Sequence, residues 1–173
     1  MEKENKYVTL EGKRFSLIGN LPEIGSKLPD FKLLKNDLTP FSLSDISQKV
    51  CIITAVPSLD TSVCDKMTRN FNQQAANLDE NILVLAVSMD LPFAQKRWCA
   101  AAGIENVITL SDHLNANFGK ALGILIEELR LLARTVFIID KNSIVRYVQL
   151  VEEISDQPDY EAAVDAAKKI LSD

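Results

Sequence analysis

The feature that most constrains the fold is an apolar run, residues 50–56, which is followed directly by a helix start that carries a cysteine. The run is rich in β-branched residues and does not alternate with polar ones, which predicts a strand buried on both faces. Pro57 ends it. Residues 60–62 are three N-cap candidates, and apolar residues recur at helical spacing over 63–79. Cys64 is therefore expected in the first turn of a helix.

This placement has a chemical consequence for Cys64. Unpaired backbone N–H groups and the positive end of the helix dipole favour a thiolate over a thiol, and the thiolate is the reactive form. Taken alone, however, a cysteine near a helix start more often behaves as a small buried hydrophobic residue. The neighbouring residues have to decide between these interpretations.

Strands and helices are expected to alternate regularly from residue 50 onward. The predicted strands are 50–56, 82–88 and 106–110, and the predicted helices are 63–79, 92–102 and 114–122. Pro92 suits a first helical turn, and Gly103 suits the residue after a helix end. The flanking parts are predicted as a hairpin over 7–18, a connector over 19–29, strands at 31–34 and 40–43, a short turn or helix at 44–45, a loop at 127–132, a hairpin of strands 134–139 and 144–151, and a last helix from 156–158 to 171. This order predicts an α/β layered domain with a mixed central sheet.

Length and charge limit the possible classes. A chain of 173 residues suits one domain. With 19 basic and 24 acidic residues and no dense Lys/Arg cluster, nucleic acid is not expected as the main partner. No apolar stretch has the length of a signal peptide or a membrane span, so we expect a cytoplasmic protein without membrane contact. In a reducing compartment, three cysteines are more often reactive thiols or buried core residues than members of structural disulfides.

Two motifs resemble those of a known family. The spacing Pro57-x-x-x-Thr61-x-x-Cys64 is similar to the PxxxTxxC signature of the peroxiredoxins, and the stretch 90–99, DLPFAQKRWC, resembles the DLPFAQxRxC stretch of their thiol peroxidase branch, which are atypical two-cysteine peroxiredoxins. The resemblance implies a thioredoxin-like fold: a mixed central β-sheet flanked by helices, with an N-terminal β-hairpin extension. One domain would then span 1–173, with a core from about 19 and the hairpin over 1–18.

The resemblance also implies roles for the residues around Cys64. Cys64 would be the peroxidatic nucleophile, oxidised by peroxide to a sulfenic acid. Thr61 would hydrogen-bond the thiolate and the peroxide, although the local sequence equally supports an N-cap. Pro57 would shield the pocket from water, although a strand terminator is its simpler reading.

Two residues far from Cys64 in the sequence complete the implied site. Arg134 matches the arginine that peroxiredoxins place beside the thiolate, where a guanidinium would favour the ionised sulfur and polarise the peroxide. A solvated strand-end arginine is the alternative, and Arg69 and Arg97 are possible substitutes. Cys99 would be the resolving cysteine that forms a disulfide with Cys64, although it could simply pack in its helix. Because bridged Cα atoms lie within about 7 Å, we expect one or both helix ends to loosen during the cycle.

These readings favour a thioredoxin-dependent peroxiredoxin that reduces hydrogen peroxide and organic hydroperoxides to water and alcohols in antioxidant defence. The family also implies a homodimer and needs no organic cofactor or metal. Cys51, inside the apolar run, is expected in the core, and the single histidine, His113, has no partner at metal-ligand spacing. One alternative is a dithiol–disulfide oxidoreductase on the same fold, which usually carries C-x-x-C, absent around Cys64. Another is a non-catalytic binding or chaperone-like domain.

Overall fold

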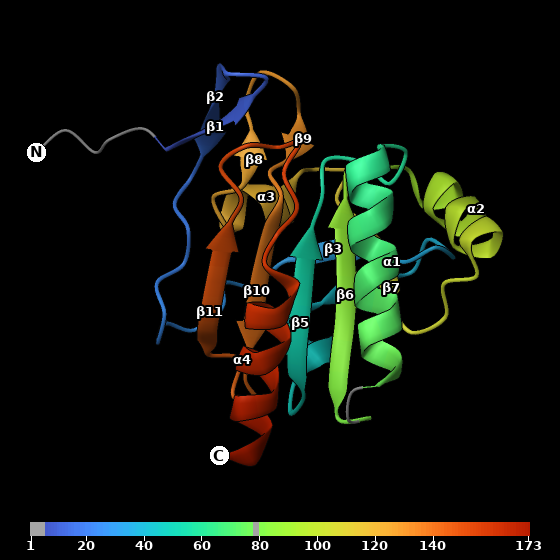
Figure 1. The fold of residues 1–173 in the computed structure, drawn as a ribbon, viewed down its shortest axis with the longest axis vertical. Coiled ribbons are helices and arrows are strands. Elements are labelled where there is room, and N and C mark those ends of the chain that lie inside the picture. The colour runs from blue at the N-terminus through green and yellow to red at the C-terminus, as the bar shows by residue number, and fades with distance from the viewer. Residues whose placement is uncertain (1–5, 78–79) are drawn as a thin grey trace, which may run out of the picture.

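A seven-stranded mixed sheet forms the centre of the molecule (Figure 1). The structure is a computed structural model that describes residues 6–77 and 80–173. In spatial order the strands are β11 (Val145–Leu150), β10 (Thr135–Ile139), β5 (Val50–Ala55), β6 (Ile82–Ser88), β7 (Ile108–Ser111), β3 (Lys32–Leu34) and β4 (Pro40–Ser42). Strands β5, β6 and β7 are parallel, whereas every other neighbouring pair is antiparallel. The predicted α/β class with a mixed sheet is confirmed.

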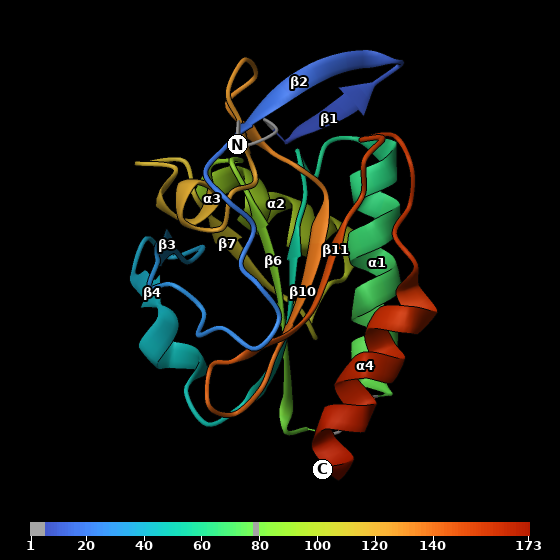
Figure 2. The ribbon, with the colours of Figure 1, turned by 90° about the vertical axis from the view of Figure 1, so that its left-hand side faces the viewer.

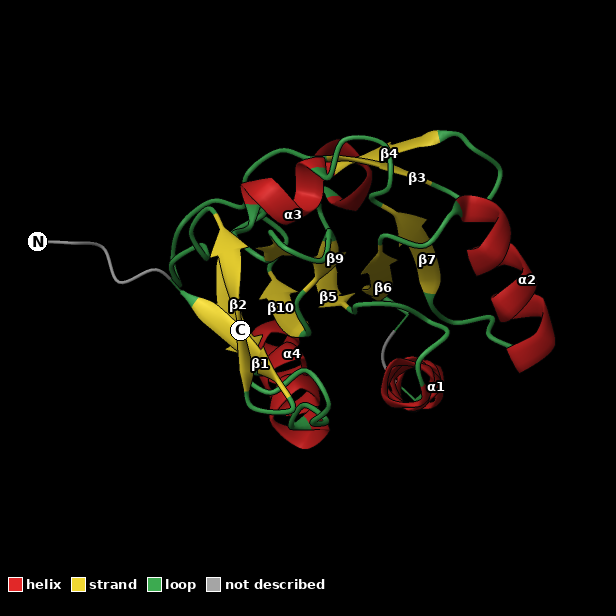
Figure 3. Ribbon diagram, turned by 90° about the horizontal axis from the view of Figure 1, so that it is seen from above, coloured by secondary structure: helices red, strands yellow, loops and turns green. Residues whose placement is uncertain are grey.

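Helices cover both faces of this sheet (Figures 2 and 3). The long helices α1 (Ser62–Ala76) and α4 (Tyr160–Ser172) lie side by side on one face. The short helices η1 (Leu43–Ile46) and α3 (Asn117–Ala121) lie on the other, and α2 (Pro92–Ala102) packs against β7. No described helix is long and apolar enough to cross a membrane.

Strand β5 explains the unbroken apolar run. Every residue in it is buried, and neighbouring side chains point to opposite faces of the sheet. Ile53 and Ala55 belong to the cluster beneath α3, whereas Val50 and Ile52 belong to the cluster beneath α1 and α4. Because both faces of β5 are covered, both sets of side chains have to be apolar.

A second, four-stranded sheet lies above the carboxyl ends of the parallel strands (Figure 2). It consists of β1 (Tyr7–Leu10), β2 (Lys13–Ile18), β8 (Leu125–Ile126) and β9 (Leu131–Leu132). The predicted hairpin over 7–18 is confirmed, whereas β9 lies within the predicted loop 127–132 and β8 directly precedes that loop. Gly123 allows the segment after α3 to lie close to the segment after β2. Its φ is +70°, and a Cβ there would lie 2.2 Å from the carbonyl carbon of Asn20. The hairpin is thereby held against the segment that follows α3.

Several element ends differ from the prediction. Helix α1 ends at Ala76, and residues 78–79 of the predicted helix lie outside the described residues. Helix α3 is shorter than the predicted 114–122 because Ala116 adopts a left-handed φ of 50°. Helix α4 begins at Tyr160, where the Asp159 side chain accepts a hydrogen bond from Ala162 N. Gly103, with a φ of 67°, ends α2 as predicted.

Candidate active site

Cys64 lies in the first turn of α1, as predicted. The helix begins at Ser62, so Thr61 is its N-cap residue. Thr61 Oγ1 accepts a hydrogen bond from Cys64 N at 3.2 Å and donates one to Ser58 O at 3.1 Å. The capping interaction therefore fixes the turn that carries the sulfur, and the thiol is fully buried.

Arg134 provides the cation at this sulfur. It comes directly before β10, which is paired with β5, so the sheet brings it to the place where the chain leaves β5 for α1. Its Nη2 donates to Cys64 Sγ at 3.1 Å. The guanidinium also donates to Ile154 O from Nε (3.1 Å) and Nη2 (3.0 Å), and its Nη1 lies 3.3 Å from Met67 Sδ. The arginine is 1% exposed, so it is not a solvated strand-end residue.

The two substitute arginines occupy other places. Arg69 Nε forms an ion pair with Asp65 Oδ2 at 2.8 Å on the exposed side of α1. Arg97 is exposed on α2. Arg134 is thus the one of the three candidates that contacts the sulfur of Cys64.

An apolar cavity of about 200 Å³ opens beside the arginine. Three of the predicted site residues, Pro57, Thr61 and Arg134, share its lining with residues of the upper sheet and the β11–α4 connection: Leu10, Val63, Ile126, Leu129, Leu131, Ile154 and Ser155. Pro57 contributes a wall that offers no hydrogen-bond donor. The cavity is large enough for a small apolar group next to the charged end of Arg134.

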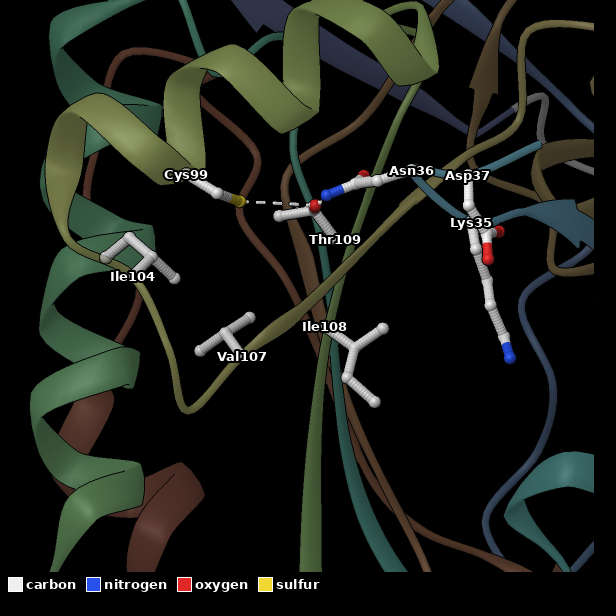
Figure 4. A pocket seen from close by; sticks show the side chains of 8 residues that line it. All are labelled: Lys35, Asn36, Asp37, Cys99, Ile104, Val107, Ile108 and Thr109. Carbon is white, nitrogen blue, oxygen red and sulfur yellow. Dashed lines mark hydrogen bonds between the residues drawn. The ribbon is translucent and has the colours of Figure 1, made fainter. Parts of the chain in front are cut away.

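Cys99 lies in α2, away from Cys64, and all three cysteines are free thiols. Its Sγ points toward Thr109 Oγ1 on β7 at 3.3 Å, and Thr109 Oγ1 in turn donates to Asn36 Oδ1 at 3.0 Å (Figure 4). The thiol is half-buried at the rim of a hollow of about 320 Å³ lined by Lys35, Asn36, Asp37, Cys99, Ile104, Val107, Ile108 and Thr109. A thiol in this position is accessible from outside, in contrast to Cys64.

The residues next to the two cysteines are linked to each other. Asp65, which follows Cys64, accepts a hydrogen bond through Oδ1 from Nε1 of Trp98, which precedes Cys99, at 2.9 Å. A second bond across the same helices runs from Arg69 Nη1 to a backbone carbonyl of α2 at 3.4 Å. These two bonds hold the first two turns of α1 against the C-terminal half of α2.

Asp90 is a residue that sequence reasoning missed, although the motif 90–99 contains it. Its carboxylate accepts hydrogen bonds from Ser58 Oγ at 2.7 Å, Leu59 N at 2.8 Å and Ser88 Oγ at 2.7 Å. The loop that leads to Cys64 is thus fastened to the residues just before α2. Within the motif, Gln95 is fully buried and donates to Ser88 Oγ and to Leu110 O.

Nothing around the site resembles a metal centre. Among residues 6–77 and 80–173, no three His, Cys, Asp or Glu side chains are grouped so that they could hold an ion. A guanidinium beside Cys64 also disfavours a second cation there. Cys51 is completely buried in β5, and burial raises the pKa of its thiol, so it is an inert core residue.

Comparison with known proteins shows which family the chain belongs to. The sequence profile of the Redoxin family matches residues 23–164, which is most of the chain. The thiol peroxidase of Halalkalibacterium halodurans is 56% identical over 164 residues, covering 95% of this chain and 98% of that protein. The chain belongs to the thiol peroxidase branch of the peroxiredoxins. The thiol peroxidase of Bacillus subtilis is a further relative, 48% identical over 164 residues and with the same coverage.

Solved structures extend the match to the fold. The crystal structure of a peroxiredoxin-like protein from Aquifex aeolicus superposes with a TM-score of 0.89 at 41% identity, covering 95% of this chain and 96% of that one. A thiol peroxidase from Chromobacterium violaceum gives a TM-score of 0.84 at 21% identity and supports the fold alone. The thioredoxin-like fold expected of a peroxiredoxin is confirmed, and the protein is a thiol-dependent, peroxide-reducing enzyme.

Proposed function

We propose that this peroxiredoxin reduces hydrogen peroxide and organic hydroperoxides through Cys64 as the peroxidatic cysteine. The observation that carries the proposal is the 3.1 Å contact between Arg134 Nη2 and Cys64 Sγ, both buried, beside a cavity that Arg134 and Thr61 line. A desolvated guanidinium at this distance stabilises a thiolate, because opposite charges attract more strongly away from water. The same cation can polarise the bound peroxide.

The first step transfers one oxygen. The thiolate of Cys64 attacks the terminal hydroxyl oxygen of ROOH, the O–O bond breaks, and the sulfur becomes a sulfenic acid. The alkoxide RO⁻ leaves and takes up a proton to give ROH. Arg134 stabilises the negative charge that moves from sulfur to the leaving oxygen, and the hydroxyl of Thr61 lies in the same turn to bind the peroxide.

The second step returns the sulfur to a form that a thiol can reduce. The thiol of Cys99 attacks the sulfenic acid, a Cys64–Cys99 disulfide forms and water leaves. Because Cys99 points to Thr109 while Cys64 points to Arg134, the start of α1, the end of α2, or both must move for this bond to form. In this proposal thioredoxin then reduces the disulfide, and the enzyme works in the cytoplasm, where thiols are kept reduced.

The lining of the cavity favours an apolar substituent on the peroxide. Ile126, Leu129 and Leu131 line the same cavity as Thr61 and Arg134. An alkyl or aryl group would bury its surface against these side chains, which hydrogen peroxide cannot do. Organic hydroperoxides are therefore the preferred substrates in this proposal.

A homodimer is part of the same proposal. Leu91 and Phe93, at the start of α2, are 52% and 66% exposed, and neighbouring exposed apolar side chains are typical of a protein–protein contact.

The two other functions considered from the sequence, a dithiol–disulfide oxidoreductase and a non-catalytic binding domain, have less support. The three residues before Cys64, 61–63, include no cysteine for a local C-x-x-C dithiol, and a binding domain has no need of a buried cysteine–arginine pair.

A steady-state assay tests the proposal: peroxide consumption coupled to thioredoxin oxidation. We expect turnover by the wild type, none by Cys64→Ser, and a single turnover by Cys99→Ser, with faster over-oxidation of Cys64 in that variant. Mass spectrometry of peroxide-treated protein under non-reducing conditions should find Cys64 joined to Cys99. Full multi-turnover activity of Cys99→Ser, or a disulfide that uses Cys51, would contradict the assigned resolving role.

A further inference from the structure

Gln157 connects the C-terminal part of the chain to the turn that carries Cys64. It lies between β11 and α4, and its Nε2 donates a hydrogen bond at 3.2 Å to the backbone carbonyl of Val63, the residue just before Cys64. Its Oε1 accepts a hydrogen bond from the hydroxyl of Tyr160. The tyrosine thus fixes the orientation of the amide, and the amide holds the first turn of α1.

The same connection contacts the active site at two more points. Ile154 O accepts two hydrogen bonds from the Arg134 guanidinium, one from Nε and one from Nη2. The ring of Tyr160 packs edge-on against Phe71 of α1, with ring centroids 5.2 Å apart. Burial raises the pKa of Tyr160 to about 12, so its hydroxyl remains a donor at neutral pH. Residues 154–160 therefore hold both the catalytic arginine and the helix that carries the sulfur.

We propose that Gln157 is a positioning residue that keeps the first turn of α1 closed on Arg134, and so sets how often Cys64 is over-oxidised before Cys99 reaches it. The inference rests on the proposed function. The sulfenic acid of Cys64 has two fates. Attack by the Cys99 thiol gives a disulfide and water, whereas a second ROOH transfers its oxygen to give a sulfinic acid and ROH.

The two fates make different demands on this turn. Disulfide formation requires the turn to leave Arg134, because the two sulfurs point to different parts of the molecule. Over-oxidation takes place with the turn closed, because it uses the same cavity as the first step. Every bond that holds the turn closed therefore favours the sulfinic acid. Gln157 supplies one such bond without touching the sulfur. It therefore affects the partition of the sulfenic acid between disulfide and sulfinic acid more than it affects the rate of the first oxidation.

The chain offers a matched pair of glutamines for the experiment. Gln157→Met keeps the length of the side chain and removes its donor. Gln149, on β11, also bonds near the start of α4, accepting from Asp159 N at 2.8 Å and donating to the Tyr147 hydroxyl at 2.9 Å, but its bonds do not reach α1. Gln149→Met is therefore the control. The readouts are the rate of the first oxidation by stopped flow and the fraction of sulfinic acid formed per turnover, measured by mass spectrometry with cumene hydroperoxide and thioredoxin.

For Gln157→Met we expect about fivefold less sulfinic acid per turnover, the equilibrium effect of one ordinary hydrogen bond, with a first-step rate close to that of the wild type. Tyr160→Phe keeps the ring on Phe71 but frees the amide, and should shift the partition in the same direction by less. An unchanged partition in Gln157→Met overturns the inference, as does an equal shift in Gln149→Met, since that would mean general loosening of α4. If the wild type consumed no peroxide, the proposed function itself would fail.

Discussion

Arg134 and Cys64 are 70 residues apart in the sequence, and their side chains meet in the interior with Nη2 3.1 Å from Sγ. Neither side chain reaches solvent to any useful extent, since their exposed fractions are 1% and 0%. A buried cation of this kind needs an anionic or polar partner, and Ile154 O and the sulfur are the groups that it contacts through Nη2. The pair is the main electrostatic feature of the site.

Replacing Arg134 by lysine should test its geometry separately from its charge. Lysine keeps the positive charge but cannot donate to Cys64 and Ile154 at once from a planar group. We expect the second-order rate constant for peroxide reduction to fall by roughly 100-fold, comparable to the loss of one preorganised donor. Stopped-flow kinetics of the first oxidation provide the measurement. A rate within a factor of two of the wild type would mean that charge alone suffices.

Thr61 should have two separable effects. Thr61→Val removes the N-cap of α1 and should lower the free energy of unfolding by about 1 kcal/mol. It should also slow peroxide reduction, because the hydroxyl in the pocket is lost. Thr61→Ser keeps the hydroxyl and should restore most of both properties. Urea denaturation and stopped-flow kinetics on the same samples distinguish the effects, and a valine variant with unchanged kinetics would leave Thr61 only its structural role.

Leu129 should influence substrate preference. It lines the apolar side of the cavity and is 37% exposed, so Leu129→Ser should disturb the fold little. Loss of apolar contact should reduce kcat/KM for cumene hydroperoxide by about 5- to 30-fold, the equivalent of about 1 to 2 kcal/mol of apolar burial. The value for hydrogen peroxide should stay nearly the same. An equal fall in kcat/KM for both substrates would mean that the organic group of the peroxide does not bind against Leu129.

Asp112 should make stability depend on pH. Its buried carboxylate accepts hydrogen bonds from Phe118 N and Gly119 N, and burial raises its pKa to about 6 from 3.8. Between these values the native state binds the proton more tightly than the unfolded state, so this group contributes less stability as the pH rises from about 4 to about 6. The change amounts to about 3 kcal/mol at most.

The matched variant for this effect is Asp112→Asn, which does not titrate. The difference in unfolding free energy between wild type and variant, measured with urea, should shift against the wild type as the pH rises from 4 to 7. Other acidic groups act on both proteins equally and cancel in this difference. A constant difference over that range would mean that Asp112 ionises normally.

Local patterns were sufficient for the parts of the site that lie close together in the sequence. Pro57, Thr61 and Cys64 belong to one strand-to-helix junction, whose apolar run and N-cap residues are readable directly, and the structure has the helix starting within one residue of the predicted position. The same holds for α2, where Pro92 and Gly103 mark both ends.

Contacts between segments that are far apart in the sequence could not be predicted from local sequence patterns. Arg134 reaches Cys64 because β10 pairs with β5, and strand pairing is not encoded in the flanking residues, so only the family resemblance pointed to it. Strands β8 and β9 have two residues each, too few for an alternating pattern to be recognised. Gln157 bonds to a backbone carbonyl, and Asp90 bonds to a backbone N–H and two serine hydroxyls, partners that the residues flanking Gln157 and Asp90 do not reveal.

The link between Asp65 and Trp98 gives the enzyme a built-in optical probe. Trp98 is the only tryptophan in the chain, and its indole N–H is bonded to the residue after Cys64 while its own neighbour is Cys99. This contact links the two helices that carry the sulfurs, so we expect the emission of the indole to change when either helix moves to form the disulfide. Each turnover can then be followed in unlabelled protein, in real time.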